Sequence, residues 1–108
     1  PDGASRAAMG VFMSTFSIKR GGDGRIHITG RFDAGRVEQA NAVFDTVSGD
    51  TVIDFSGLRY ISSVGPGILV SAQQKLETDG HKLSIVGASE HIRELFRITR
   101  FDILIDIE

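Results

Sequence analysis

The feature that most constrains the fold is a regular alternation of short strand-like segments with amphipathic helical segments. After an opening pair of strands, every strand-type pattern is followed by a helix-type pattern, in the order β-β-α-β-α-β-α-β. Strands that are separated by a helix pair in parallel through right-handed crossovers. The sequence therefore predicts an α/β fold, with a mixed sheet of four or five strands and three helices packed mainly on one face.

The opening pair is predicted to form a β-hairpin. Residues 12–19 alternate loosely between apolar and polar, whereas residues 25–32 alternate cleanly and place Ile26, Ile28 and Phe32 on one face. The segment between them, residues 21–24, reads GGDG, and glycine supplies the positive φ that a tight reversal needs. We expect one face of the hairpin to be buried.

The three helices are predicted from apolar residues spaced three and four apart. The first is expected from an N-cap at Asp33 to about Val47, the second over residues 64–78, and the third over residues 89–98 with Ser89 as its cap. Strands are expected at residues 51–55, 82–86 and 101–107, the last with Ile103, Ile105 and Ile107 on one face. Residues 57–63 are expected to form a connecting loop.

Composition limits the class of protein. The 108 residues suffice for one domain, predicted as residues 13–108 after a lead of residues 1–12 that is outside the fold. There is no cysteine, and the three histidines lack ligand spacing, so we expect no metal and no cofactor. The net charge of −2, without a basic stripe, argues against a nucleic-acid partner. No apolar run approaches the roughly 20 residues of a membrane helix, so we expect a cytoplasmic protein with no membrane partner.

The segment that most favours a functional site is ISSVGPGIL, residues 61–69, where a predicted strand is followed by a predicted helix. Ser62 or Ser63 is predicted to cap that helix, while Gly65 and Gly67 keep its first turn free of bulk. The Ser63 hydroxyl is expected to be exposed at the positive end of the helix dipole, which favours a phosphate by about 0.3–1 kcal/mol. The local pattern alone leaves open whether the serine is functional or only a cap.

The same segment carries a family resemblance. LRYISSVGPGIL, which follows TVIDFSG, resembles the signature of STAS domains, the anti-sigma factor antagonists. The segments ITGRFD, GHKLSIVGAS and HIRELFRITRFD resemble three further parts of that family in the same order and spacing. The resemblance spans residues 14–107 and implies the STAS fold.

The resemblance also implies a function and a site. STAS antagonists bind an anti-sigma factor, often a serine kinase of the GHKL type, and so release a sigma factor. The kinase phosphorylates a serine before the second helix, which by position is Ser63, and a serine phosphatase reverses the modification. We therefore expect a partner-binding surface made of Asp33, Ser62, Ser63, Val64, Gly65, Pro66 and Gly67.

Two departures from the family pattern stand in this surface. Ser62 replaces the acidic residue that often precedes the phosphorylated serine, and Pro66 replaces a bulky apolar residue. Asp33 matches an acidic residue that the family carries after its second strand, but it serves equally well as a helix cap.

Other functions are weighed against this one. A nucleotide-binding enzyme is disfavoured because the SSVGPG segment lacks the Gly-Lys-Ser/Thr ending of a phosphate loop. A serine hydrolase is disfavoured because no Gly-x-Ser-x-Gly surrounds Ser63 and no histidine can be assigned as its base. We expect no enzymatic activity. STAS modules also occur in stressosomes, secretion control, transporters and lipid transport, and the sequence leaves these alternatives open.

Overall fold

The computed structural model of the chain describes residues 16–108. It contains one sheet in the order β1-β2-β3-β5-β6, with β4 paired to β2 off this path. The strands are β1 (Phe16–Arg20), β2 (Ile26–Phe32), β3 (Thr51–Asp54), β4 (Leu58–Ile61), β5 (Leu83–Val86) and β6 (Asp106–Ile107). The helices are α2 (Val37–Phe44), α3 (Val64–Thr78) and α4 (Glu90–Ile98), with short 3-10 turns η1 (Ala34–Arg36) and η2 (Phe101–Ile103). The predicted lead, residues 1–12, and residues 13–15 of the predicted domain lie outside the described residues.

The predicted hairpin is confirmed over the described residues, and residues 12–15 of its predicted first strand lie outside them. Strands β1 and β2 pair antiparallel from Phe16 opposite Gly30 to Arg20 opposite Ile26. The reversal between them is closed by a hydrogen bond from the Gly21 amide to the Arg25 carbonyl, at 2.8 Å. The predicted inner face, formed by Ile26, Ile28 and Phe32, is completely buried. Burial of an aliphatic or aromatic side chain of this size contributes about 1.5–3 kcal/mol.

Strand β2 pairs with two different strands along its length. Its first residues pair in parallel with β3, at Ile26 opposite Ile53, and its last residues pair in parallel with β4, at Phe32 opposite Ile61. The ladder shifts by one residue between Gly30 and Arg31, where Gly30 has a φ of 84°. Such a bulge bends the strand, and glycine adopts that φ without strain.

The prediction that residues 57–63 form a loop is therefore wrong for Leu58–Ile61, which form β4. The burial pattern of β4 is inward at Leu58 and Ile61 and outward at the two residues between them. This pattern does not alternate, and strict alternation is the signal from which a strand is recognised. The chain forms a strand here because β2 extends beyond β3 and offers it free backbone partners.

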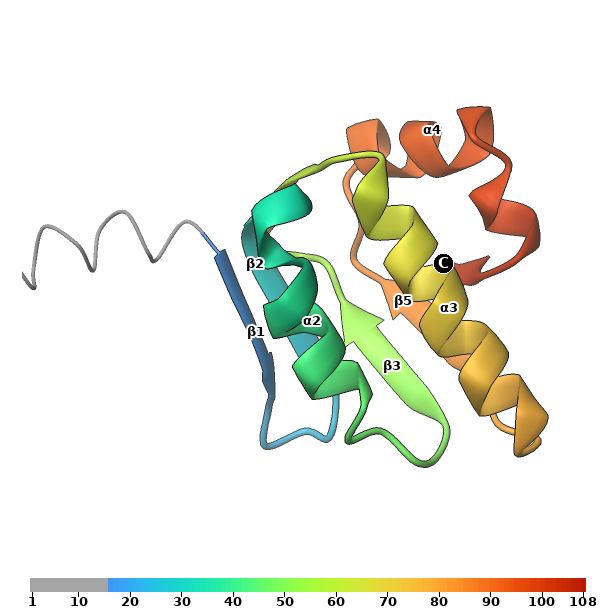
Figure 1. Cartoon of the computed structure of the whole chain (residues 1–108). Helices are drawn as coiled ribbons and strands as arrows, with labels where there is room; N and C mark the ends of the chain where they lie inside the picture. Colours follow the sequence, from blue (N-terminus) through green and yellow to red (C-terminus); the bar gives the residue numbers. More distant parts are fainter. Residues whose placement is uncertain (1–15) are drawn as a thin grey trace, which may run out of the picture.

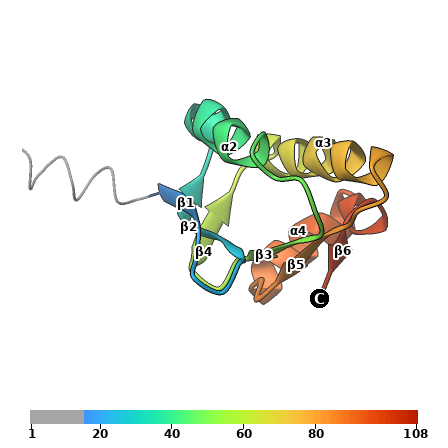
Figure 2. The same ribbon diagram turned by 90° about the horizontal axis from the view of Figure 1, so that it is seen from below.

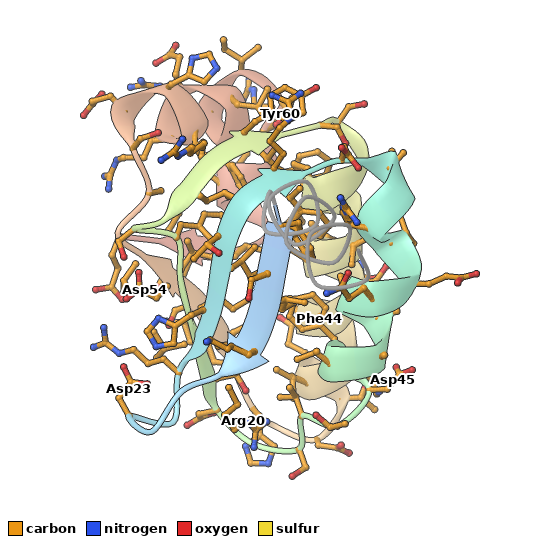
Figure 3. The ribbon with its side chains drawn as sticks, turned by 90° about the vertical axis from the view of Figure 1, so that its left-hand side faces the viewer. Arg20, Asp23, Phe44, Asp45, Asp54 and Tyr60 are labelled. Atoms are coloured by element: carbon orange, nitrogen blue, oxygen red, sulfur yellow. The ribbon has the colours of Figure 1, made fainter. Side chains whose placement is uncertain are left out.

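The helices lie in two places around the sheet. Helices α2 and α3 lie side by side over one face, as Figures 1 and 2 show. Helix α4 lies across one end of the sheet, on the side away from α2 (Figures 2 and 3). It is joined to the core by Phe96, whose ring centroid is 6.3 Å from that of Phe55. The predicted mixed α/β architecture is confirmed.

The first helix differs from its prediction at both ends. It starts with the 3-10 turn η1 and ends at Phe44 instead of Val47. The amides of Thr46 and Val47 bond to carbonyls three residues earlier, so the last turn is tighter than an α-helix. Helix α3 spans the predicted residues, and α4 is capped as predicted by the Ser89 hydroxyl, 3.3 Å from the Ile92 amide.

The predicted final strand over residues 101–107 is wrong except for Asp106–Ile107. Arg100 has a φ of 66°, and the 3-10 turn η2 follows it. The amides of Leu104 and Ile105 both bond to the Phe101 carbonyl, so these groups are not available to a sheet ladder. Ile103 is 70% exposed as a result, while Ile105 is buried.

Candidate functional site

The candidate site lies at the edge of the sheet where β2 and β4 end together. Because the two strands are parallel, the residues that follow them come to the same edge. The Ser62 amide donates to the Phe32 carbonyl at 2.9 Å, which continues the ladder one residue past β4. Asp33 directly follows Phe32, and Ser63 directly precedes α3. We call residues 62–67, which include the first turn of α3, the serine loop.

The two adjacent serines have different environments. Ser63 is exposed, whereas Ser62 is half-buried and its hydroxyl oxygen is shielded from solvent. Within residues 16–108 the Ser62 hydroxyl has no hydrogen-bond partner. An unpaired buried hydroxyl costs about 1–3 kcal/mol, so this side chain is held inward against its preference for water. Only the Ser63 hydroxyl is presented to a protein that approaches from outside.

The prediction that Ser62 or Ser63 caps α3 is wrong. Ser63 occupies the N-cap position, but its φ of −62° and ψ of −19° are already helical and its side chain makes no capping bond. A capping serine has extended backbone angles, which turn its hydroxyl back over the first turn. The first turn is closed instead by the Gly65 amide, which donates to the Ser62 carbonyl at 3.1 Å. The Ser63 hydroxyl is therefore not engaged by the helix that follows it.

The rest of the serine loop divides into an inner and an outer part. Gly65 and Pro66 are buried, and a Cβ at position 65 would lie 2.4 Å from Cγ1 of Ile61. Val64 is 41% exposed and Gly67 is half-buried, with open space where its Cβ would be. The inner residues let the helix pack closely on β4. The outer residues, Val64 and Gly67, have small side chains or none and leave space at the surface after Ser63.

Asp33 has the capping role that the sequence offered as one of its two readings. Its Oδ1 accepts a hydrogen bond from the Gly35 amide at 3.1 Å and so caps η1. The residue is half-buried at the edge that Ser62 also reaches. The capping bond fixes the carboxylate at the end of β2.

One pair beside the serine loop escaped the sequence analysis. Arg31 lies opposite Tyr60 across the β2–β4 ladder, and its guanidinium carbon is 4.2 Å from the centroid of the tyrosine ring. Tyr60 is 37% exposed, near the end of the molecule that Figure 3 shows at the top. The pairing was missed because it follows from the register of β4 on β2, and residues 58–61 were expected to be a loop.

A cluster of titratable groups lies near the other end of β2. His27 is 3.1 Å from Asp23 Oδ1 and 3.8 Å from Asp54 Oδ2, and Figure 3 shows the two aspartates on the same side of the sheet. Hydrogen bonding from His27 lowers the pKa of Asp23 below its ordinary value. The pKa of Asp54 is lowered by hydrogen bonding from the Ser56 side chain and amide, the amide being 2.8 Å away. These bonds tie the hairpin turn to the turn between β3 and β4.

Residues 16–108 contain no cluster of three or more histidine, cysteine, aspartate or glutamate side chains suited to a metal ion. They also contain no helix with the length and apolar character needed to cross a bilayer.

The sequence matches a known domain family over most of its length. Residues 17–106 match the family described as "Mlab, STAS domain". The chain therefore belongs to the STAS domain family, as the sequence motifs predicted. No match was found among proteins with curated functions.

Solved structures of STAS proteins share the fold. A Thermotoga maritima protein assigned as an anti-sigma factor antagonist has a TM-score of 0.68 at 17% identity, and the alignment covers 85% of this chain and 84% of that one. The unphosphorylated anti-sigma factor antagonist SpoIIAA has a TM-score of 0.57 at 21% identity, with 77% and 82% covered. A sulfate transporter family protein from Wolinella succinogenes has a TM-score of 0.61 at 20% identity, with 70% and 65% covered. At these identities the likeness establishes the fold.

Proposed function

We propose that this chain is an anti-sigma factor antagonist that is switched by phosphorylation of Ser63. In its unmodified form it binds a cytoplasmic anti-sigma factor of the GHKL serine kinase type and so releases a sigma factor. The observation that carries the proposal is the contrast between the two serines. Ser63 is exposed and makes no capping bond, while the Ser62 hydroxyl is buried. The exposed serine is also the one at the family's phosphorylated position.

The proposed switch is electrostatic and needs no catalytic group on this chain. A phosphate on Ser63 adds about −1.5 to −2 charges at neutral pH. It would lie at the N-terminus of α3, where the helix dipole favours an anion. The modified protein therefore keeps its fold, while an acidic partner surface that had closed over the serine loop is repelled. A serine phosphatase restores the binding form.

The identity of the phosphorylated residue is tested with two matched alanine variants. Each purified GHKL-type serine kinase of the source organism is incubated with wild type, Ser62→Ala and Ser63→Ala, and mass spectrometry locates the phosphate. We expect modification of wild type and Ser62→Ala but not of Ser63→Ala, because only the Ser63 hydroxyl is accessible. A phosphate on Ser62 contradicts the proposal.

The effect of the charge is tested by calorimetry with the kinase that modifies the protein. Ser63→Ala is expected to bind as wild type does, and Ser63→Asp to bind more weakly by about 1–3 kcal/mol, because a desolvated charge meets an acidic surface. Phosphorylated wild type is expected to lose more affinity than Ser63→Asp, since phosphate carries more charge. Equal binding of the phosphorylated and bare proteins would refute the switch.

A second candidate is a STAS module within a transport complex. It is favoured by the family description "Mlab, STAS domain" and by the likeness to a sulfate transporter family protein. A pull-down from source-cell extract separates the two candidates. The informative partner is the protein that wild type and Ser63→Ala retain and that Ser63→Asp does not. A soluble serine kinase supports the antagonist, and a transporter subunit supports the transport module.

A further inference from the structure

Strand β4, which leads into the serine loop, carries an exposed aromatic residue with an arginine stacked on it. The guanidinium of Arg31 covers one face of the Tyr60 ring at 4.2 Å from its centroid. A stacked guanidinium uses its flat face for the ring and keeps its in-plane N–H groups free for a carboxylate. The tyrosine therefore holds the arginine in one position at low entropic cost while the donors remain in solvent.

The charge at this position is not neutralised by the rest of the fold. Arg31 and its strand neighbour Arg59 are both exposed, and neither forms a salt bridge within residues 16–108. By contrast, Arg25 and Arg97 have carboxylate partners there. Further along the chain, Val64 at the start of α3 is 41% exposed. Arginine and tyrosine in such a setting are the residue types that most often anchor a protein interface.

We propose that Arg31 and Tyr60 form the docking point for an acidic, partly apolar segment of the partner protein. A carboxylate of that segment binds the in-plane N–H groups of Arg31, and an apolar side chain packs on the exposed edge of Tyr60. The inference deepens the proposed function and rests on it for the identity of the partner.

The first test needs no partner, since Tyr60 is the only tyrosine of the chain and there is no tryptophan. Its fluorescence is followed while the full chain is titrated with a capped, non-aromatic peptide of sequence ELEELE. We expect a saturable change in wild type, no change with a KLKKLK peptide, and loss of the change in Arg31→Ala. A titration without any change in wild type overturns the inference.

Arg20 provides a matched control. It is an exposed arginine at the hairpin end of β1, at the opposite end of the molecule from Tyr60 in Figure 3. Arg20→Ala removes the same charge and is expected to keep the peptide response. If both alanine variants lose the response equally, net charge alone explains it and the docking point is refuted. Circular dichroism melts of both variants check that each remains folded.

The second test uses the kinase that modifies the protein. Arg31→Ala is expected to lower its affinity about tenfold, Tyr60→Ala by a similar factor, and Arg20→Ala not at all. If the kinase binds Arg31→Ala as tightly as wild type, the docking point is wrong while the proposed function stands. If no kinase binds wild type but the acidic peptide does, the proposed function fails and the docking point stands.

Discussion

Substitution of Gly65 by alanine tests how tightly α3 packs on the strand that carries the serines. The new Cβ would lie 2.4 Å from Cγ1 and 2.7 Å from Cδ1 of Ile61, closer than real Cβ atoms approach other carbons. Ile61 is only 5% exposed and is branched at its own Cβ, so it has little freedom to move away. Overpacking of this kind costs about 1–3 kcal/mol. Alanine regains about 0.5–1 kcal/mol of helix propensity, so the net effect lies between about zero and a loss of about 2.5 kcal/mol.

Gly67 is the matched control in the same helical turn. Nothing lies within 4 Å of the position that its Cβ would occupy. Gly67→Ala is therefore expected to stabilise the fold by about 0.4–1 kcal/mol, through the reduced freedom of the unfolded chain. Urea unfolding followed by far-UV circular dichroism measures both variants. The packing argument is refuted if Gly65→Ala is as stable as Gly67→Ala.

Two further predictions concern carboxylates. In urea unfolding, Asp33→Asn is expected to be as stable as wild type, and Asp33→Ala to be less stable by about 1 kcal/mol. Asparagine can accept the hydrogen bond from the Gly35 amide and alanine cannot. If Asp33→Ala is as stable as wild type, the capping role is wrong. The fold lowers the pKa of Asp54, so its contribution is complete above the ordinary value of 3.8 and is lost as the pH falls through the lower folded value. Thermal melts between neutral and strongly acid pH are therefore expected to show a smaller acid-induced loss of stability in Asp54→Asn than in wild type, and an unchanged acid-induced loss would contradict this.

The elements that the sequence predicted well are those whose pattern is set by a single buried face. The hairpin and helices α3 and α4 are of this kind, since each shows its period without help from the rest of the chain. Strand β4 could not be predicted in this way, because it exists only where β2 has backbone groups left over. The last strand failed for the opposite reason. The sequence alternates as a strand does at Ile103, Ile105 and Ile107. The amides of Leu104 and Ile105 nevertheless form local hydrogen bonds with the Phe101 carbonyl instead of strand pairs.

For the site, the sequence predicted which segment matters but not how it is built. The position of Ser63 before α3 and its exposure follow from the strand-to-helix pattern, and the structure agrees. The burial of the Ser62 hydroxyl and the absence of a side-chain cap depend on the backbone conformation between β4 and α3. A local sequence motif does not predict that conformation. The Arg31–Tyr60 stack depends on pairing between strands distant in sequence and was out of reach for the same reason.

The alignment of β4 along β2 determines which serine faces outward. Ser62 directly follows the last paired residue, Ile61, and its amide bonds to the Phe32 carbonyl, so a slip of one residue along β2 would reposition both serines. The alignment is held upstream, where the Gly30 amide bonds to the Gly57 carbonyl at 2.9 Å and a Cβ at position 57 would lie 2.6 Å from Thr29 Cγ2. Selection of the phosphate acceptor would thus be decided at a glycine that no kinase needs to contact. In the proposed switch, a methyl group at position 57 would therefore change which serine is modified without altering either serine.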